Sequence, residues 1–185
     1  MNVRNRFATV LTAAVLAGSL VGGVQAQATD TAAVTINPGT LTASIVAGDF
    51  GSADYSFADQ DVTSNGLVLT ITNKTGSPAG WTVTTTATDY VGQARSGESI
   101  PIDETTTTGT EVLTKVVGQE VTGMSEAVSL ASGGTAEPII TVEAPAGAGQ
   151  GQYTLTLSQL TLNVPGGTLA QTYTSTLTVN VPSAP

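Results

Sequence analysis

The sequence predicts an all-β fold, and three observations support this prediction. Charged residues make up only 10% of the chain and aromatic residues 4%, while glycine occurs 21 times in 185 residues. Threonine fills 31 positions after residue 26, and its branched Cβ suits a pleated strand while its hydroxyl tolerates water. Several segments alternate apolar and polar residues with a period of two, which is typical of strands with one face on a core.

The alternation is clearest in four segments, at residues 67–71, 81–88, 153–158 and 172–181. Weaker strands are expected at residues 34–36, 41–46, 112–117, 139–142 and 160–164. Turn residues separate these segments, at positions 37–39, 65–66, 76–78, 133–134, 146–151 and 165–167. About eight to ten short strands with frequent turns predict a single immunoglobulin-like, Greek-key antiparallel β-sandwich.

The amino-terminal region is typical of a secretory signal peptide, which we assign to residues 1–26. Arg4 and Arg6 precede an apolar run from Phe7 to Val24, and Ala26 lies where a signal peptidase would cleave. The remaining 159 residues, 27–185, fit one domain of ordinary size. We therefore expect an exported protein with a single extracellular domain that is associated with the cell surface.

The part of the chain after residue 26 is strongly acidic. It contains all 14 acidic residues and only three basic ones, Lys74, Arg95 and Lys115. Such a surface repels nucleic acid and anionic lipid headgroups, so neither is an expected partner. No apolar stretch in this part is long enough to span a membrane. Because cysteine is absent, stability is expected to come from packing without disulfides.

The residue inventory argues against catalysis. The chain has no histidine and no cysteine, which removes a serine–histidine–aspartate triad, a histidine zinc site and a thiol nucleophile. Two carboxylates could in principle hydrolyse a glycoside, but such enzymes usually bring an aromatic-lined cleft, and aromatic residues are few here. We therefore expect a protein that is not an enzyme and that needs no cofactor.

Four aspartates fall within thirteen residues: Asp49, Asp54, Asp59 and Asp61. Calcium requires several carboxylate and carbonyl oxygens at one point. The spacing does not match an EF-hand loop, and no glutamate follows at the required distance. The four aspartates are therefore weak calcium candidates. A solvated acidic segment is the favoured interpretation, and no metal site is assigned.

Residues 91–110 form the least regular part of the chain and include a run of four threonines, 105–108. We predict a long surface loop here. Functional residues are often carried on such loops, although a loop without function is an equal alternative.

A longer pattern resembles a known family. Residues 67–73 read Leu-Val-Leu-Thr-Ile-Thr-Asn, and after a short turn residues 80–90 read Gly-Trp-Thr-Val-Thr-Thr-Thr-Ala-Thr-Asp-Tyr. Residues 37–41 and 50–51 upstream and residues 164–165 and 173–182 downstream extend the pattern. It resembles the WxL-type surface domains of Gram-positive bacteria and their relatives. The resemblance implies a secreted β-sandwich that attaches non-covalently to the cell wall, with peptidoglycan as its ligand.

The resemblance also implies the residues that contact the ligand, namely Trp81, Asp89, Tyr90 and Tyr173. The chain departs from the family pattern in two places. The defining motif reads Trp81-Thr-Val83 instead of Trp-x-Leu, and the second motif is replaced by residues 173–177, which lack tryptophan. Trp81 has a second, favoured interpretation as an aromatic anchor of the core.

A second class of function stays open, a structural subunit that polymerises into a surface fibre by strand complementation. Residues 29–45, rich in threonine and alternating, are the candidate donor strand. Residues 153–181 contain no charged side chain, so we expect their strands to be either central in a sheet or an edge that a donor strand pairs. Of the two functions, wall binding is favoured. The expected partners are cell-wall polysaccharide or peptidoglycan, or other surface proteins, and self-association is the alternative.

The first testable prediction concerns export. We expect cleavage after Ala26 or Ala28, so that the exported protein begins at Gln27 or Thr29. Mass spectrometry of the protein recovered from the cell exterior measures the terminus. A chain that retains Met1 or Asn2 would contradict the assignment.

Overall fold

The computed structural model describes residues 33–95, 97–130 and 138–182. Residues Ile36–Pro185 form one compact unit, which is described here by itself. The predicted signal peptide and the turn expected at residues 133–134 lie outside the described residues. Within the described residues, no helix is long and apolar enough to cross a membrane.

The described residues contain strands and one short 3-10 helix. The first strands are β1 (Leu41–Ala47), β2 (Gln60–Ser64), β3 (Leu67–Asn73), β4 (Trp81–Ala87), β5 (Tyr90–Gly92) and β6 (Ser99–Ile100). The 3-10 helix η1 (Ile102–Glu104) precedes β7 (Thr105–Thr107), β8 (Glu111–Gly118), β9 (Ser125–Val128) and β10 (Ile140–Ala144). The last strands are β11 (Gly151–Leu157), β12 (Leu160–Val164), β13 (Tyr173–Thr174) and β14 (Leu177–Asn180).

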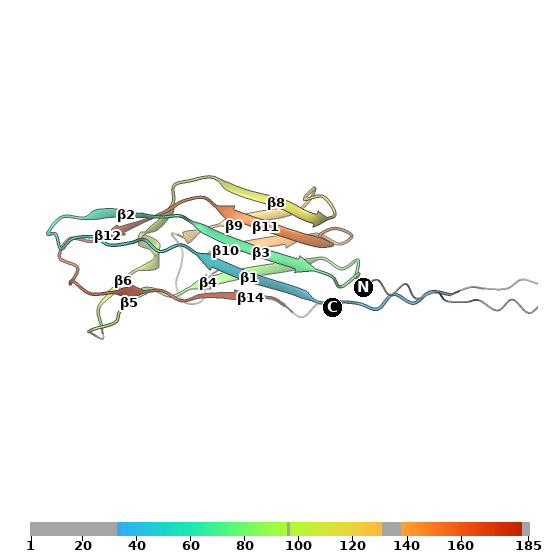
Figure 1. Ribbon diagram of the computed structural model, residues 1–185, viewed down its shortest axis with the longest axis horizontal. Helices are drawn as coiled ribbons and strands as arrows, with labels where there is room; N and C mark the ends of the chain where they lie inside the picture. Colours follow the sequence, from blue (N-terminus) through green and yellow to red (C-terminus); the bar gives the residue numbers. More distant parts are fainter. Residues whose placement is uncertain (1–32, 96, 131–137, 183–185) are drawn as a thin grey trace, which may run out of the picture. The chain divides into compact units, whose positions relative to one another are not determined.

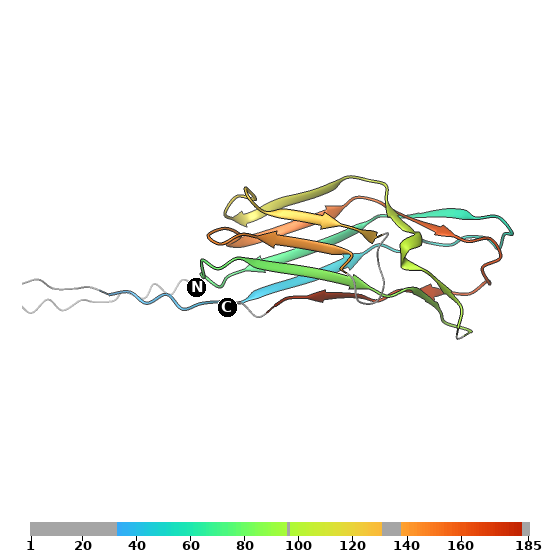
Figure 2. The same cartoon turned by 180° about the vertical axis from the view of Figure 1, so that it is seen from behind.

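Two four-stranded antiparallel sheets form the body of the fold, in the orders β1-β3-β11-β8 and β14-β4-β10-β9. They form two layers, and in Figure 1 the first sheet lies in front of the second, which faces the viewer in Figure 2. Their facing side chains make one hydrophobic core, to which β3, β4, β10 and β11 contribute the buried residues. The predicted all-β sandwich is therefore confirmed, while its immunoglobulin-like, Greek-key classification stays a prediction.

Each layer continues into a three-stranded sheet, β2-β12-β7 in one layer and β13-β5-β6 in the other (Figure 1). The continuation keeps the register of the central strands. Leu67 of β3 pairs with Leu157 of β11. Ser64 of β2, three residues before Leu67, pairs with Leu160 of β12, three residues after Leu157. Thus β2 and β3 form one long strand with a two-residue interruption, and so do β11 and β12.

The interruption changes which residues face inward. Leu157 and Leu160 are both buried although they are three positions apart, whereas an unbroken strand buries residues an even number apart. Gly66 makes this possible, because its φ is 80° and a Cβ there would lie 1.9 Å from the carbonyl oxygen of Leu157. Only glycine fits this close approach.

Most of the predicted strands are confirmed, namely those at residues 41–46, 67–71, 81–88, 112–117, 139–142, 153–158 and 160–164. The strand predicted at 34–36 is wrong, since Val34 and Ile36 are exposed and unpaired to any described strand. The strand predicted at 172–181 is divided into β13 and β14, because Ser175 and Thr176 bond instead to Thr88. Three strands outside the irregular region, β2, β9 and β13 as a separate element, were not predicted.

The long surface loop predicted at residues 91–110 is also wrong. This region contains most of β5, then β6, η1 and β7. Its apolar residues Ile100 and Ile102 are buried, as is Thr105. Short strands of two or three residues give too few alternating positions to be recognised as a pattern, and burial fixes them here.

Trp81 lies in the core, at the start of β4. Its side chain is 7% exposed, and its ring is tilted against that of Tyr153 with centroids 6.3 Å apart. The indole Nε1 donates a hydrogen bond of 3.1 Å to the carbonyl oxygen of Gly149, which also accepts 3.0 Å from the Asn73 amide. Trp81 therefore fixes the connection between β10 and β11 on the end of the core.

The second prediction is that Trp81→Ala destabilises the fold by about 3–5 kcal/mol, because removing a large packed aromatic side chain leaves a cavity. Urea unfolding measures the loss, and Thr82→Ala, at the partly exposed neighbouring position of β4, should change stability much less. Near-native stability of Trp81→Ala would contradict the role as a core anchor.

Candidate functional site

The candidate site is a cleft of ≈ 750 Å³ between the continuations of the two layers. We call this part of the unit, which contains β2, β5, β6, β7, β12 and β13, the cleft end. One wall is the connection after β1, residues 47–55, and another is the segment 168–175 that leads into β13. Apolar side chains from both layers line its depth, including Ile100, Ile102, Leu162 and Leu177. Figure 2 shows η1 at this end in yellow-green.

Tyr90 of β5 is the central aromatic residue of the cleft. Its ring packs edge-on against Phe50, with centroids 6.0 Å apart and an interplanar angle of 82°. Its hydroxyl lies 3.0 Å from Oγ1 of Thr105, a residue that is 1% exposed. Burial raises the pKa of Tyr90 above 10.0, and the hydrogen bond with Thr105 opposes the shift. The neutral phenol is therefore held as a donor or acceptor inside an apolar wall.

Tyr173 lines the opposite wall. Its hydroxyl donates 3.0 Å to the carbonyl oxygen of Leu169 and accepts 3.1 Å from Nε2 of Gln171. The Gln171 Oε1 in turn accepts 3.0 Å bonds from the backbone N–H groups of Ala94 and Arg95. These bonds attach the segment 168–175 to the turn after β5 and give this wall a fixed position.

An exposed aromatic pair lies beside the cleft. Tyr55 and Phe57 are 54% and 88% exposed, and their rings meet edge-on with centroids 5.3 Å apart. Their segment is held by the backbone, since Gly167 N–H donates 2.8 Å to the carbonyl oxygen of Ser56. Tyr55 also lines the cleft. An exposed aromatic surface of this kind favours contact with a ligand.

Two of the four predicted ligand residues, Tyr90 and Tyr173, meet in this cleft. Asp89 does not line it but adjoins it, because its Oδ1 accepts 3.0 Å from Ile102 N–H and so positions η1. Trp81 is not brought to the cleft. It lies nine positions before Tyr90, which is roughly 30 Å along an extended strand, and it borders a separate shallow hollow of ≈ 600 Å³.

The four acidic residues weighed for calcium are not gathered at one point. Asp59 accepts 2.8 Å from Gly166 N–H, and Asp61 accepts 3.0 Å from the Asn163 amide. Asp49 and Asp54 line the cleft instead. In the described part of the chain, no three acidic, histidine or cysteine residues lie close enough together to hold a metal ion.

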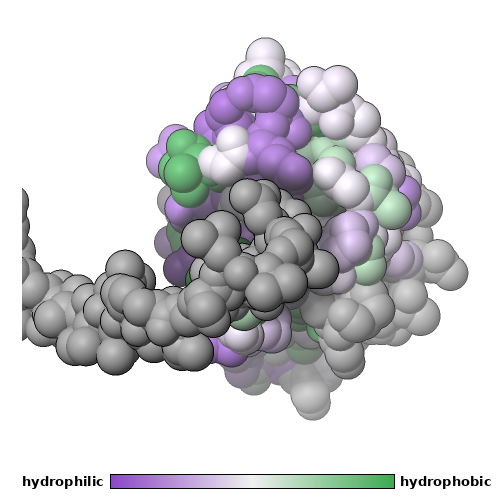
Figure 3. Space-filling model, turned by 90° about the vertical axis from the view of Figure 1, so that its right-hand side faces the viewer, coloured by the Kyte–Doolittle hydropathy of each residue, from purple (hydrophilic) through white to green (hydrophobic). Residues whose placement is uncertain are grey.

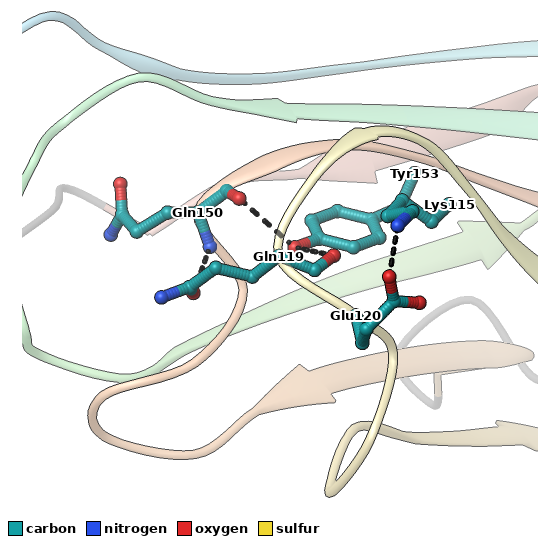
Figure 4. Close-up of polar contacts among 5 residues, drawn as sticks. All are labelled: Lys115, Gln119, Glu120, Gln150 and Tyr153. Atoms are coloured by element: carbon teal, nitrogen blue, oxygen red, sulfur yellow. Dashed lines mark hydrogen bonds and ion pairs between the residues drawn. The ribbon is translucent and has the colours of Figure 1, made fainter.

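The opposite end, which we call the turn end, contains the connections 74–80, 119–124 and 145–150. Figure 3 views the molecule from this side, and hydrophilic surface gathers at its upper part. Figure 4 shows its main polar cluster, in which the Tyr153 hydroxyl faces the carbonyl oxygens of Gln119 and Gln150, at 3.2 Å and 3.1 Å.

Two further contacts complete this cluster. The backbone N–H of Gln150 donates 3.0 Å to Oε1 of Gln119, and Lys115 pairs with Glu120. Burial raises the pKa of Tyr153, an effect that the charge of Lys115 opposes. Since these groups bond to one another, the cluster has a structural role.

No family model, no curated protein and no solved structure matches this chain. The resemblance to WxL-type domains therefore stays a prediction from the sequence motifs. The candidate site is defined by the geometry of the cleft alone.

Sequence reasoning did not identify Phe50 and Thr105 as site residues. Phe50 was treated as part of a solvated acidic segment, and Thr105 as part of a surface loop. The available signal was the presence of three aromatic residues within an otherwise small and acidic stretch, residues 49–61. Aromatic side chains in such a stretch indicate a surface that packs on something.

The third prediction follows from the raised pKa of Tyr90. In the folded protein Tyr90 holds its proton more tightly than in the unfolded chain, where the pKa is 10.0. Its contribution to stability is therefore complete below pH 10 and is lost as the pH rises above 10.

Urea unfolding of wild type and Tyr90→Phe between pH 8 and pH 11 tests this expectation. The variant should be less stable by about 1 kcal/mol at pH 8, because it lacks the bond to Thr105. It should also lose less stability than wild type above pH 10. Parallel pH profiles for the two proteins would contradict the argument.

Proposed function

We propose that this protein is a non-enzymatic extracellular domain that attaches non-covalently to the bacterial cell wall, with peptidoglycan as ligand. The observation that carries the proposal is the cleft of ≈ 750 Å³ at the cleft end. Its volume is in the range of small-ligand sites, which are mostly apolar with a few fixed polar groups. Tyr90, Tyr173 and Thr105 supply such groups here, and exposed Tyr55 extends the aromatic surface outward.

The lining supports binding rather than hydrolysis. Its two carboxylates, Asp49 and Asp54, lie on the same exposed segment. A glycosidase needs two carboxyl groups that flank the scissile bond. The other polar groups of the lining are hydroxyls, an amide and the backbone, which orient a ligand without transferring protons readily near neutral pH.

The fibre subunit is retained as the alternative. Several sheet edges favour a monomer, whereas β1 is a seven-residue edge strand without a charged residue or proline. Long exposed edges are usually protected by charge, short length, proline or a bulge. The edge strand β8 carries Glu111 and Lys115 and has a register irregularity opposite residues 152–153. The edge strands β2 and β9 carry Asp61 and Glu126, and β14 has four residues and is followed by Pro182.

The uncharged region 153–181 was predicted to contain central strands or an edge strand, and it contains both. The strands β11 and β12 are central, each with two neighbours, whereas β13 and β14 are short edges with one neighbour each. The last five residues of the candidate donor segment are also engaged, since Leu41–Ile45 belongs to β1 and pairs with β3 of the same chain. A donor strand would therefore have to come from the residues before β1.

The fourth prediction tests wall binding at the cleft. We expect the protein to sediment with purified cell walls and to remain monomeric by light scattering at high concentration. Ala53→Trp places a bulky ring on the exposed segment that lines the cleft, and it should weaken sedimentation at least about tenfold.

The matched control is Ala127→Trp, at an exposed position of β9 on the turn-end half of the sandwich. Both variants should keep the wild-type urea midpoint, and the control should keep its wall affinity. Absence of sedimentation together with concentration-dependent oligomers would favour the fibre. In that case, deletion of residues 27–36, which leaves β1 intact, should abolish assembly.

A further inference from the structure

We infer that the cleft recognises the peptide component of peptidoglycan, through a free amino group on that peptide. This inference rests on the proposed function and specifies its ligand. It derives from the charges that surround the cleft, from two unpartnered carboxylates in its lining, and from the unpaired backbone of one wall.

The lining of the cleft contains negative but no positive side chains. Asp49 and Asp54 line it, and no lysine or arginine does. None of the basic residues of the described chain lines the cleft, although the Arg95 backbone bonds to Gln171 of one wall. Lys74 follows β3 at the turn end, Lys115 pairs with Glu120, and Arg95 lies in the turn after β5. An anionic ligand would therefore meet no compensating charge in the cleft.

Asp49 and Asp54 also differ from three other aspartates near the cleft. Asp59, Asp61 and Asp89 each accept a hydrogen bond from the protein. The carboxylates of Asp49 and Asp54 make no hydrogen bond or ion pair with any described residue, and both residues are exposed. They are therefore free to accept charge-assisted hydrogen bonds from an ammonium group that enters the cleft.

The charges around the cleft also favour a cationic ligand. Eight of the acidic residues lie in the segments 49–61 and 89–104, which build the cleft end: Asp49, Asp54, Asp59, Asp61, Asp89, Glu98, Asp103 and Glu104. Arg95 is the one basic residue in these segments. A low-dielectric cleft within such a field concentrates cationic groups and repels polyanions. Polyphosphate polymers of the wall are therefore poor candidates for the occupant.

The wall formed by residues 49–53 offers backbone groups as well. No backbone hydrogen bond joins these residues to another described residue, although the flanking Gly48 N–H and Asp54 carbonyl oxygen are both bonded. An extended peptide can use such unpaired groups in the manner of an added strand. The sugars of the glycan are N-acetylated and carry no free amino group, whereas wall peptides combine an amide backbone and carboxylates with free amino groups. The peptide therefore offers the groups that this wall and the two carboxylates can bind.

The experiment uses soluble muropeptides whose peptides carry free amino groups, released from peptidoglycan by a muramidase. Isothermal titration calorimetry compares them with the same muropeptides after acetylation of the amines, and with oligomers of N-acetylglucosamine, an uncharged glycan that carries no peptide. We expect acetylation to weaken binding about tenfold, and peptide-free glycan to bind no better than the acetylated sample.

The variant Asp49→Asn/Asp54→Asn should reproduce the loss with untreated muropeptides and show no further loss on acetylation. The control Glu111→Gln/Glu126→Gln removes the same net charge from exposed positions on β8 and β9 and should bind like wild type. Equal weakening by the control, or equal affinity for native and acetylated muropeptides, would overturn the inference.

Two outcomes separate the inference from the proposed function. Whole walls that sediment with the protein while amine acetylation has no effect would leave wall binding standing and refute amine recognition. Failure of both walls and muropeptides to bind would refute the proposed function itself. Equal affinity for a lysine-containing tripeptide unrelated to the wall would refute the assignment to wall peptide.

Discussion

The close approach of Gly66 to the carbonyl oxygen of Leu157 is the constraint on which the rest of the fold depends. It allows two neighbouring long strands to be interrupted at the same height while their pairing register continues. At that point the alternation of inward and outward side chains shifts by one residue, so Leu157 and Leu160 are both buried. The opposite layer is interrupted as well, since Ala87 and Tyr90 both face inward although they are three positions apart. The cleft lies beyond these interruptions.

At the interruption, the pairing register between a central strand and its edge neighbour shifts by one residue. In one layer, Leu157 pairs with Glu111 of β8 whereas Leu160 pairs with Thr107 of β7, which is a shift of one residue. The opposite layer also shifts by one residue, but the extra residue lies on the β4–β5 side, since Leu177 pairs with Ala87 and Thr174 pairs with Val91. A bulge increases the local twist of a strand. The two layers can therefore change direction at this height without breaking the sheet, and the connection between β12 and β13 passes from one layer to the other (Figure 1).

The sequence was sufficient to predict the strands whose alternation is long and whose neighbours are central, such as 67–71 and 153–158. It was insufficient where tertiary contacts decide the structure. The segment 91–110 contains strands of two or three residues that are ordered by burial of Ile100 and Ile102, and no periodicity can reveal them. For the site, Tyr90 and Tyr173 were named through the family resemblance. Phe50 was missed, because its role depends on a ring contact across the cleft that chain position alone does not indicate.

The separation of the two ends explains how a protein without disulfides can combine stability with an open site. At the turn end Trp81, Asn73, Tyr153 and Gln150 satisfy one another or the backbone, and the core between β3, β4, β10 and β11 is continuous. At the cleft end, acidic groups and an unpaired backbone segment remain exposed to solvent. They reduce the stability of the fold little, because water forms hydrogen bonds with them. The eight acidic residues of the cleft end also repel one another. A cationic ligand would relieve that repulsion, so binding should stabilise the cleft end in addition to occupying it.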